Sequence, residues 1–112
     1  MHKMKLKNKP FNSILFGNKD IEMRLFDEKR QKIKIGDEIE FTNIDTGKIF
    51  TVLVTNLYKF KSFKELYNNF PKERLGYTKD EISDYHDMQK YYSDEEINKY
   101  GVVGIEIKVI NN

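Results

Sequence analysis

Three residues of types that support polar chemistry, and a glycine beside them, lie close together near the start of this 112-residue sequence. They are Gly17, Lys19, Glu22 and Arg24. A lysine acts as a base or nucleophile when its surroundings lower its pKa, and a glutamate can activate a water or accept a hydrogen bond from an exocyclic amine. An arginine binds phosphate or stacks on a base. The group is therefore the candidate site, and it suits nucleotide binding or hydrolysis.

A predicted strand would position two of these side chains. Ile21, Met23 and Leu25 alternate with the polar Glu22 and Arg24. Because successive residues of a strand point to opposite faces, the apolar set should face a core while the polar pair emerges side by side on the other face. The strand would thus present a carboxylate and a guanidinium from a rigid element.

Gly17 and Lys19 come just before this strand or at its start. Gly17 is suited to a tight turn with positive φ, or to a close approach of another backbone segment. Lys19 has the parity of the apolar face, so it either precedes the strand proper or is re-aimed by a β-bulge. Both alternatives are open at the level of the sequence.

The composition predicts a single domain over residues 1–112 with a substantial apolar core. The chain has 8 Phe, 7 Tyr, no Cys and a formal net charge of +2. Disulfides and thiolate metal sites are excluded, and any basic patch must come from local clustering rather than from the total charge. No apolar run approaches the roughly 20 residues that span a bilayer, and the lysine-rich start lacks the apolar stretch of a secretory signal. We expect a soluble cytoplasmic protein without membrane association.

Hydrophobic periodicity, turn residues and capping signals predict several strands, then helices, then a closing strand. Strands are expected over 1–8, 19–25, 38–43, 48–60 and 102–110, and helices over 10–17, 63–70, 78–91 and 93–100. Each of the last three helices begins with a capping-box pattern, in which a serine or threonine precedes a glutamate by three residues. The order has no βαβ rhythm. It indicates an α+β fold, with a small curled or barrel-like sheet and helices on one side.

The pattern Gly17-x-Lys19-x-x-Glu22-x-Arg24 resembles the signature of ASCH domains, which belong to the PUA-like superfamily. Further segments resemble parts of that family in the same order: the basic, Gly-Asp entry to a strand at 34–39, a strand-to-helix junction at 58–66, and the last helix and closing strand at 92–107. The resemblance covers about residues 9 to 110. It implies a PUA-like β-barrel with flanking helices, and a cleft lined by the lysine, glutamate and arginine of the motif.

The resemblance also implies two kinds of function. Proteins of the superfamily are associated with RNA binding and with recognition of modified bases. A small bacterial branch that resembles these domains hydrolyses an N-acetylated cytidine, with the motif lysine, the residue at the position of Glu22 and a helix-borne glutamate as working groups. This sequence departs from that branch, because Glu22 stands where the branch has a threonine. The helix glutamate has only a positional candidate, Glu73.

The main prediction is that the cleft binds RNA or a nucleotide-like ligand. Arg24 and Lys19 would contact phosphate or a base, and Glu22 would accept from the exocyclic amine of cytosine or adenine. Tyr58 or Phe63 would supply a stacking face, although an aromatic residue where a strand meets a helix is also typical of a core. Two clusters of basic residues, over 3–9 and 29–34, would contact the backbone of a nucleic acid. The alternative is that the motif has only a structural role, in which Glu22 forms an ion pair with Arg24 or Lys19 on one face of the sheet.

The second prediction is an amidohydrolase acting on an N-acylated nucleoside such as N4-acetylcytidine, with Lys19 and Glu22 as its catalytic residues. It ranks lower because a carboxylate beside the lysine favours the charged ammonium. Glu22 as a general base would also serve a ribonuclease. A third class is an accessory domain that binds a protein partner through exposed apolar patches. The oligomeric state is left open.

Neither a cofactor nor a metal is predicted. Asp80, Asp84 and Asp87 would share one face of the helix expected over 78–91. His86 would project about 100° away from its neighbour Asp87 in such a helix, so it would not complete a ligand set.

Overall fold

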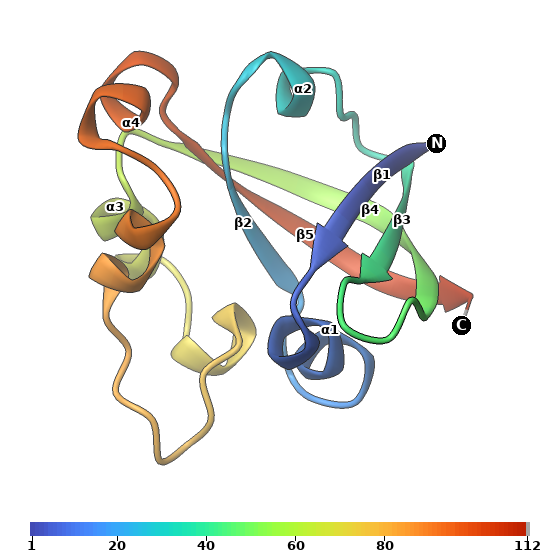
Figure 1. Cartoon of the computed structure of the whole chain (residues 1–112). Helices are drawn as coiled ribbons and strands as arrows, with labels where there is room; N and C mark the ends of the chain where they lie inside the picture. Colours follow the sequence, from blue (N-terminus) through green and yellow to red (C-terminus); the bar gives the residue numbers. More distant parts are fainter. Residues whose placement is uncertain (112) are drawn as a thin grey trace.

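A curled sheet of five strands forms the centre of the computed structural model, which describes residues 1–111 (Figure 1). The strands are His2–Leu6 (β1), Ile21–Leu25 (β2), Glu38–Asn43 (β3), Ile49–Phe60 (β4) and Val102–Asn111 (β5). Their spatial order is β1-β3-β4-β5-β2. β1 pairs with β3 in parallel, and the other neighbours are antiparallel. The sheet therefore has β1 and β2 as its edge strands.

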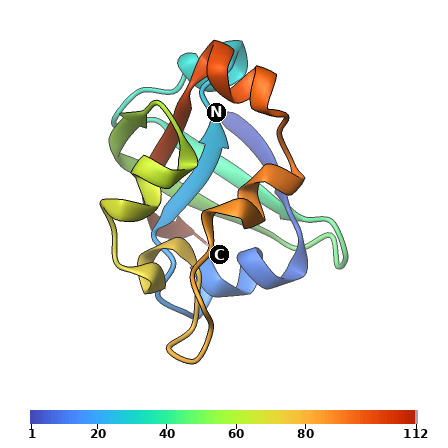
Figure 2. The same ribbon diagram turned by 90° about the vertical axis from the view of Figure 1, so that its left-hand side faces the viewer.

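Short helices surround the sheet, so the expected α+β class is confirmed. The α-helices are Asn8–Leu15 (α1), Glu28–Gln31 (α2), Phe63–Asn68 (α3) and Asp94–Tyr100 (α4), and the 3₁₀ helices are Lys72–Leu75 (η1) and Tyr85–Lys90 (η2). Figures 1 and 2 show α3, η2 and α4 gathered on the side of β2, whereas α1 connects β1 to β2 at the lower end of the sheet in Figure 1.

Side-chain caps explain where α3 and α4 begin. The hydroxyl of Ser62 accepts from the N–H of Glu65, and that of Ser93 accepts from the N–H of Glu96. At Ser93 the capping box is reciprocal, because the Glu96 carboxylate accepts from the Ser93 N–H. At the other helix Glu65 accepts from the N–H of Lys61 instead. Both predicted helix starts are confirmed.

The helix predicted over 78–91 is wrong, because turns precede η2 there. The Glu81 carboxylate accepts from the Thr78 N–H, as in a capping box, but the Glu81 N–H donates to the Thr78 carbonyl and closes a turn. Ile82, the first apolar residue of the segment expected to be this helix, is 88% exposed, so the start of the segment has no core to pack against. A second cap, by the side chain of Asp84, then begins η2.

Two apolar cores lie on the two faces of β2. The first fills the inside of the curled sheet with residues of β1, α1, β3, β4 and β5. The second lies between β2 and the helices α3, η1 and α4. Ile21, Met23 and Leu25 belong to the second core, as the alternation predicts. Glu22 and Arg24 consequently face the inside of the curl.

The two edge strands approach each other without pairing. Arg24 on β2 donates from Nη2 to the carbonyl oxygen of Lys5 on β1, at 3.0 Å. In a closed barrel, backbone hydrogen bonds would join β1 to β2, whereas here the side chain of Arg24 links the two strands. The sheet is thus a half-barrel with a seam between β1 and β2, and the motif residues lie at that seam.

Candidate functional site

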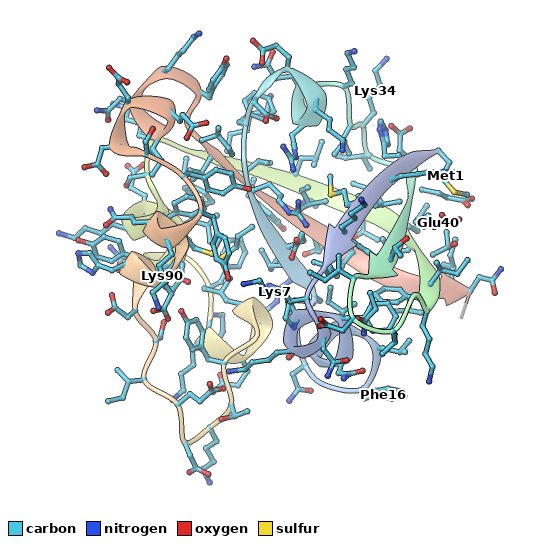
Figure 3. The ribbon with its side chains drawn as sticks, in the orientation of Figure 1. Met1, Lys7, Phe16, Lys34, Glu40 and Lys90 are labelled. Atoms are coloured by element: carbon cyan, nitrogen blue, oxygen red, sulfur yellow. The ribbon has the colours of Figure 1, made fainter. Side chains whose placement is uncertain are left out.

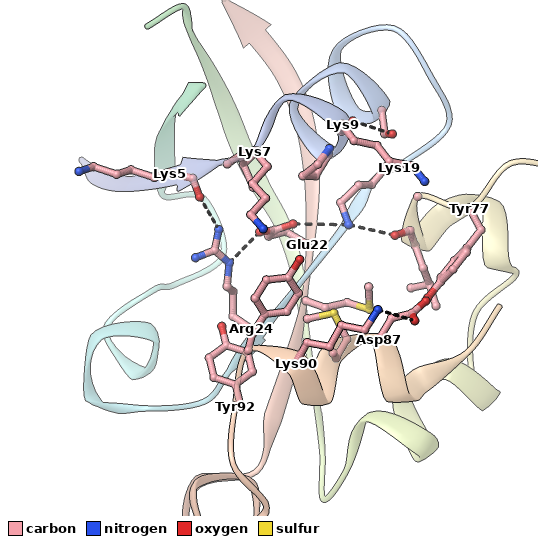
Figure 4. Close-up of a pocket in the computed structure, with 18 of the residues that line it drawn as sticks. Lys5, Lys7, Lys9, Lys19, Glu22, Arg24, Tyr77, Asp87, Lys90 and Tyr92 are labelled. Carbon is pink, nitrogen blue, oxygen red and sulfur yellow. Dashed lines mark hydrogen bonds and ion pairs between the residues drawn. The ribbon is translucent and has the colours of Figure 1, made fainter. Parts of the chain in front are cut away.

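A cavity of about 550 Å³ opens at the seam between β1 and β2 (Figure 4). Lys19, Glu22 and Arg24 form its polar floor. Its walls come from β1, α1, η2 and the segments on either side of η2. The structure therefore brings the three charged residues of the predicted motif together in one hollow.

Lys19 lies two residues before the start of β2, so the first of the two alternatives for its position is confirmed. Its side chain is only 6% exposed. The ammonium nitrogen Nζ donates to the Leu75 carbonyl at 3.0 Å and lies 3.5 Å from Glu22 Oε1. Burial lowers the pKa of Lys19, although the neighbouring Glu22 carboxylate opposes the shift. The amine is therefore closer to neutrality than a lysine in water.

Glu22 is buried between two cations. Its Oε2 accepts a hydrogen bond from Arg24 Nε at 2.7 Å, and its Oε1 faces Lys19. Burial by itself would raise the pKa of Glu22, but the charges and hydrogen bonds of Arg24 and Lys19 hold that pKa below its usual value. Glu22 is thus an anion at neutral pH, in a fixed orientation.

The floor keeps hydrogen-bonding capacity for a ligand. A carboxylate offers about four lone-pair sites, an ammonium three donors and a guanidinium five. Glu22 uses sites for two cations, Lys19 donates to the Leu75 carbonyl and faces Glu22, and Arg24 donates to Glu22 and Lys5. These contacts therefore do not use every donor and acceptor of the three side chains.

Tyrosines and one aspartate form a hydrogen-bonded wall of the cavity. The hydroxyls of Tyr67 and Tyr77 are 2.9 Å apart, and the Tyr77 hydroxyl donates to Asp87 Oδ2 at 2.7 Å. Burial raises the pKa of Tyr67 to about 12 and also raises the pKa of Tyr77, so both remain neutral phenols. These bonds connect α3, the turn after η1 and η2 into one wall.

Sequence reasoning missed most of this wall. It considered Asp87 only as a possible metal ligand, and it named none of the tyrosines of this wall as a site residue. The available signal was compositional, since five of the seven tyrosines fall between residues 67 and 92. Tyr91 and Tyr92 follow η2 and line the cavity together with Tyr67 and Tyr77.

The two aromatic residues predicted to stack on a ligand lie elsewhere. The Tyr58 ring packs edge-on against Phe70 with centroids 5.1 Å apart, and its hydroxyl accepts from Asn56. Phe63 is 2% exposed and stacks on Tyr92 at 6.0 Å. Neither Tyr58 nor Phe63 lines the cavity. Both pack against the second core.

Gly17 and Glu73 also lie outside the lining of the cavity. A Cβ atom at position 17 would lie 2.8 Å from the Ser13 carbonyl oxygen, so this glycine permits a close backbone approach rather than a positive φ. Glu73 is part of η1. The carboxylates that do line the cavity, within residues 1–111, are Glu22 and Asp87.

Among residues 1–111, no group of three or more histidine, aspartate and glutamate side chains is placed to hold a metal ion. No helix in the described chain has the length and apolar character needed to cross a membrane.

Comparisons with known proteins identify the family. The chain matches the model of the ASCH domain over residues 4–111. It is similar to the crystal structure of the hypothetical protein PH0355, with 36% identity, a TM-score of 0.77 and coverage of 96% of this chain and 97% of that chain. It is also similar to the solution NMR structure of protein PF0455 from Pyrococcus furiosus, with 33% identity, a TM-score of 0.71 and coverage of 99% and 98%.

A more distant likeness concerns the fold alone. The crystal structure of an ASCH domain from Lactobacillus crispatus is 15% identical, with a TM-score of 0.67 over 99% of this chain and 81% of that chain. No curated protein matches the sequence. On the family match, and with its PUA-like α+β half-barrel, the chain belongs to the ASCH domain family.

Proposed function

We propose that this ASCH domain binds a nucleobase, as part of RNA or of a nucleotide-like molecule, in the cavity at the seam. The observation that carries the proposal is the cluster of the buried Lys19 and Glu22 with the partly buried Arg24 on the floor of a tyrosine-walled cavity. A PUA-like fold is often linked to RNA binding, which agrees with this use of the site.

The size and chemistry of the cavity suit a heteroaromatic ring. Its volume of about 550 Å³ falls within the range of roughly 300–1,000 Å³ that is usual for small-molecule sites. Tyrosine side chains on its walls offer faces on which a base can stack. A ring that is held between such faces would present its polar edge to the floor.

The floor offers a specific partner for each polar atom of a base edge. The free lone pairs of Glu22 would accept from an exocyclic amine, as on cytosine or adenine. The cations Lys19 and Arg24 would donate to a ring carbonyl or ring nitrogen. Because these three groups hold one another in place, the site would recognise the base with little reorganisation.

Nuclear magnetic resonance tests the proposal directly. Unlabelled ribonucleosides, ribonucleotides and short single-stranded RNA are added to ¹⁵N-labelled protein, and shifts of the backbone amide signals are followed. We expect the shifts to concentrate at Lys19, Met23 and Tyr77, and to be lost in Arg24→Glu. Shifts confined to another face, or no shifts with any probe, would contradict the proposal.

The second candidate function is hydrolysis of an N-acylated nucleoside, and the burial of Lys19 favours it. A lysine with a lowered pKa supplies some neutral amine, which can take a proton from water or attack a carbonyl. Addition of water to N4-acetylcytidine would break the amide bond and release cytidine and acetate. Chromatography after incubation with this compound, with Lys19→Ala as control, detects the reaction. Absence of cytidine at high protein concentration would leave binding alone.

The structure gives less support to the third function class, an accessory domain that binds a protein partner. Such a domain needs a contiguous exposed apolar patch. The most exposed large apolar side chains are Ile82, in the turns before η2, and Phe16, which follows α1 and points into solvent (Figure 3). They lie in separate segments, whereas the polar residues of the motif converge on one cavity.

A further inference from the structure

The cavity carries far more positive charge than the chain as a whole. Six cationic side chains line it against the two anionic side chains of Glu22 and Asp87, whereas the formal net charge of the chain is only +2. The cations are Lys5, Lys7, Lys9, Lys19, Arg24 and Lys90. A hollow lined mainly by one sign of charge raises the local concentration of ions of the other sign. The cavity therefore favours an anionic ligand.

Most of the excess positive charge lies at the mouth of the cavity, where Lys5, Lys7, Lys9 and Lys90 are found, rather than on its floor. The floor cations Lys19 and Arg24 share the carboxylate of Glu22. At the mouth, Lys9 and Lys90 each lie within ion-pair distance of a carboxylate, the latter at 3.6 Å. The other two lysines at the mouth are Lys5 and Lys7. Their ammonium groups form no ion pair with a carboxylate among residues 1–111.

Of these two lysines, Lys7 is better placed to contact a ligand in the cavity. Figure 4 shows its side chain pointing toward the centre of the cavity, whereas that of Lys5 points away. The Lys7 ammonium lies 5.5 Å from the centre of the Tyr91 ring, which is at the mouth and is 59% exposed. Lys7 and Lys90 reach the mouth from different parts of the chain, the junction between β1 and α1 and the end of η2 (Figures 3 and 4).

We infer that the ligand carries a phosphate group, which Lys7 binds at the mouth while the base occupies the floor. The inference rests on the proposed function and names its ligand class, a nucleotide or nucleic-acid strand rather than a neutral nucleoside. A lysine ammonium binds a phosphate oxygen as a point charge, through a short charge-assisted hydrogen bond. A terminal phosphate and a phosphodiester both supply this chemistry.

Calorimetric titration at one fixed salt concentration tests the inference. The probes are the four ribonucleosides, their 5′-monophosphates and the four ribo-homotrinucleotides without terminal phosphate. Each is titrated into the wild type, Lys7→Glu and the matched control Lys3→Glu. Lys3 is exposed on β1, the strand that ends just before Lys7, and it does not line the cavity. Its replacement changes the net charge equally. Lys7→Gln repeats the comparison with a smaller change of charge.

We expect a phosphorylated probe to bind about tenfold more tightly than its nucleoside, as one charge-assisted hydrogen bond would provide. Lys7→Glu should remove this difference and Lys3→Glu should keep it. Tighter monophosphates would identify a terminal phosphate as the bound group, and tight binding of trinucleotides alone would identify a phosphodiester.

Two results would overturn the phosphate site while leaving the proposed function intact. One is equal binding of nucleosides and phosphorylated probes by the wild type. The other is an equal loss in Lys3→Glu and Lys7→Glu, which would reveal a general effect of charge. If none of the probes binds to the wild type, both the phosphate site and the proposed function fail.

Discussion

Gly76 lies against the side chain of Lys19, so closely that a Cβ atom at position 76 would stand 3.1 Å from Lys19 Cδ. Gly76 follows η1 with a φ of +107°, in the left-handed region that favours glycine. The residue before it, Leu75, offers its carbonyl to Lys19 Nζ. The turn at the end of η1 therefore both packs on the lysine and fixes its ammonium beside Glu22.

Gly76→Ala should destabilise the protein and displace Lys19. A left-handed backbone at alanine costs about 1–2 kcal/mol, and contact of the new methyl group with Lys19 should add to this cost. Gly47→Ala is the matched control, because Gly47 has a φ of +76° but open space where its Cβ would lie. Urea denaturation gives both free energies of unfolding. Equal losses would show that the contact with Lys19 adds nothing.

Glu22→Gln should lower the free energy of unfolding by about 3–5 kcal/mol, as expected when one partner of a buried ion pair is removed. The amide would leave the charges of Lys19 and Arg24 without their buried counter-ion. Glu38→Gln, on the exposed end of β3, should change the same free energy by no more than about 0.5 kcal/mol. Denaturant titration of the two variants decides, and a Glu22→Gln protein as stable as the wild type would contradict the prediction.

Acidification should reduce the stability of the fold through Glu22. Its pKa in the folded protein is below the usual 4.5, so the unfolded chain binds more protons in this range. The stabilisation is present above pH 4.5 and is lost as the pH falls through the lower, folded pKa. Unfolding free energies measured from about pH 5 to pH 3 should fall more steeply for the wild type than for Glu22→Gln. Parallel curves would assign the acid sensitivity to other carboxylates.

The motif could be predicted from the sequence because its geometry is local. Alternation along one strand places Glu22 and Arg24 on the same face, whatever lies around them. The position of Lys19 before the strand was one of only two alternatives. The α+β class with a curled or barrel-like sheet also followed from the order of the predicted elements.

The walls of the cavity could not be predicted in the same way, because they depend on distant contacts. Tyr67, Tyr77 and Asp87 meet only after η2 folds back beside α3. The capping pattern at Thr78 is satisfied locally by a turn, and Ile82, the first apolar residue after it, is exposed, so no packing sustains a helix at this point. The position of Phe63 where a strand meets a helix was also clear from the sequence, yet its ring is buried in the second core.

Lys19 should titrate below the 10.5 that is usual for lysine, because burial disfavours its charged form. The Glu22 carboxylate opposes this shift, so Glu22→Gln should move the pKa of Lys19 further down. Carbon-13 NMR of the Lys19 Cε signal against pH measures both values. A pKa of 10.5 or more in the wild type would contradict the prediction and would weaken the case for hydrolysis.

Tyr77→Phe should loosen η2, because the Tyr77 hydroxyl donates to Asp87 and lies beside the hydroxyl of Tyr67. Loss of this link should cost about 1 kcal/mol and speed up amide hydrogen exchange in η2. Tyr100→Phe is the control, since it removes a comparable hydrogen bond, to Glu28, outside the cavity. Faster exchange in η2 that is confined to Tyr77→Phe would show that this hydroxyl holds the wall in place, whereas equal exchange in both variants would show that the wall is held by packing alone.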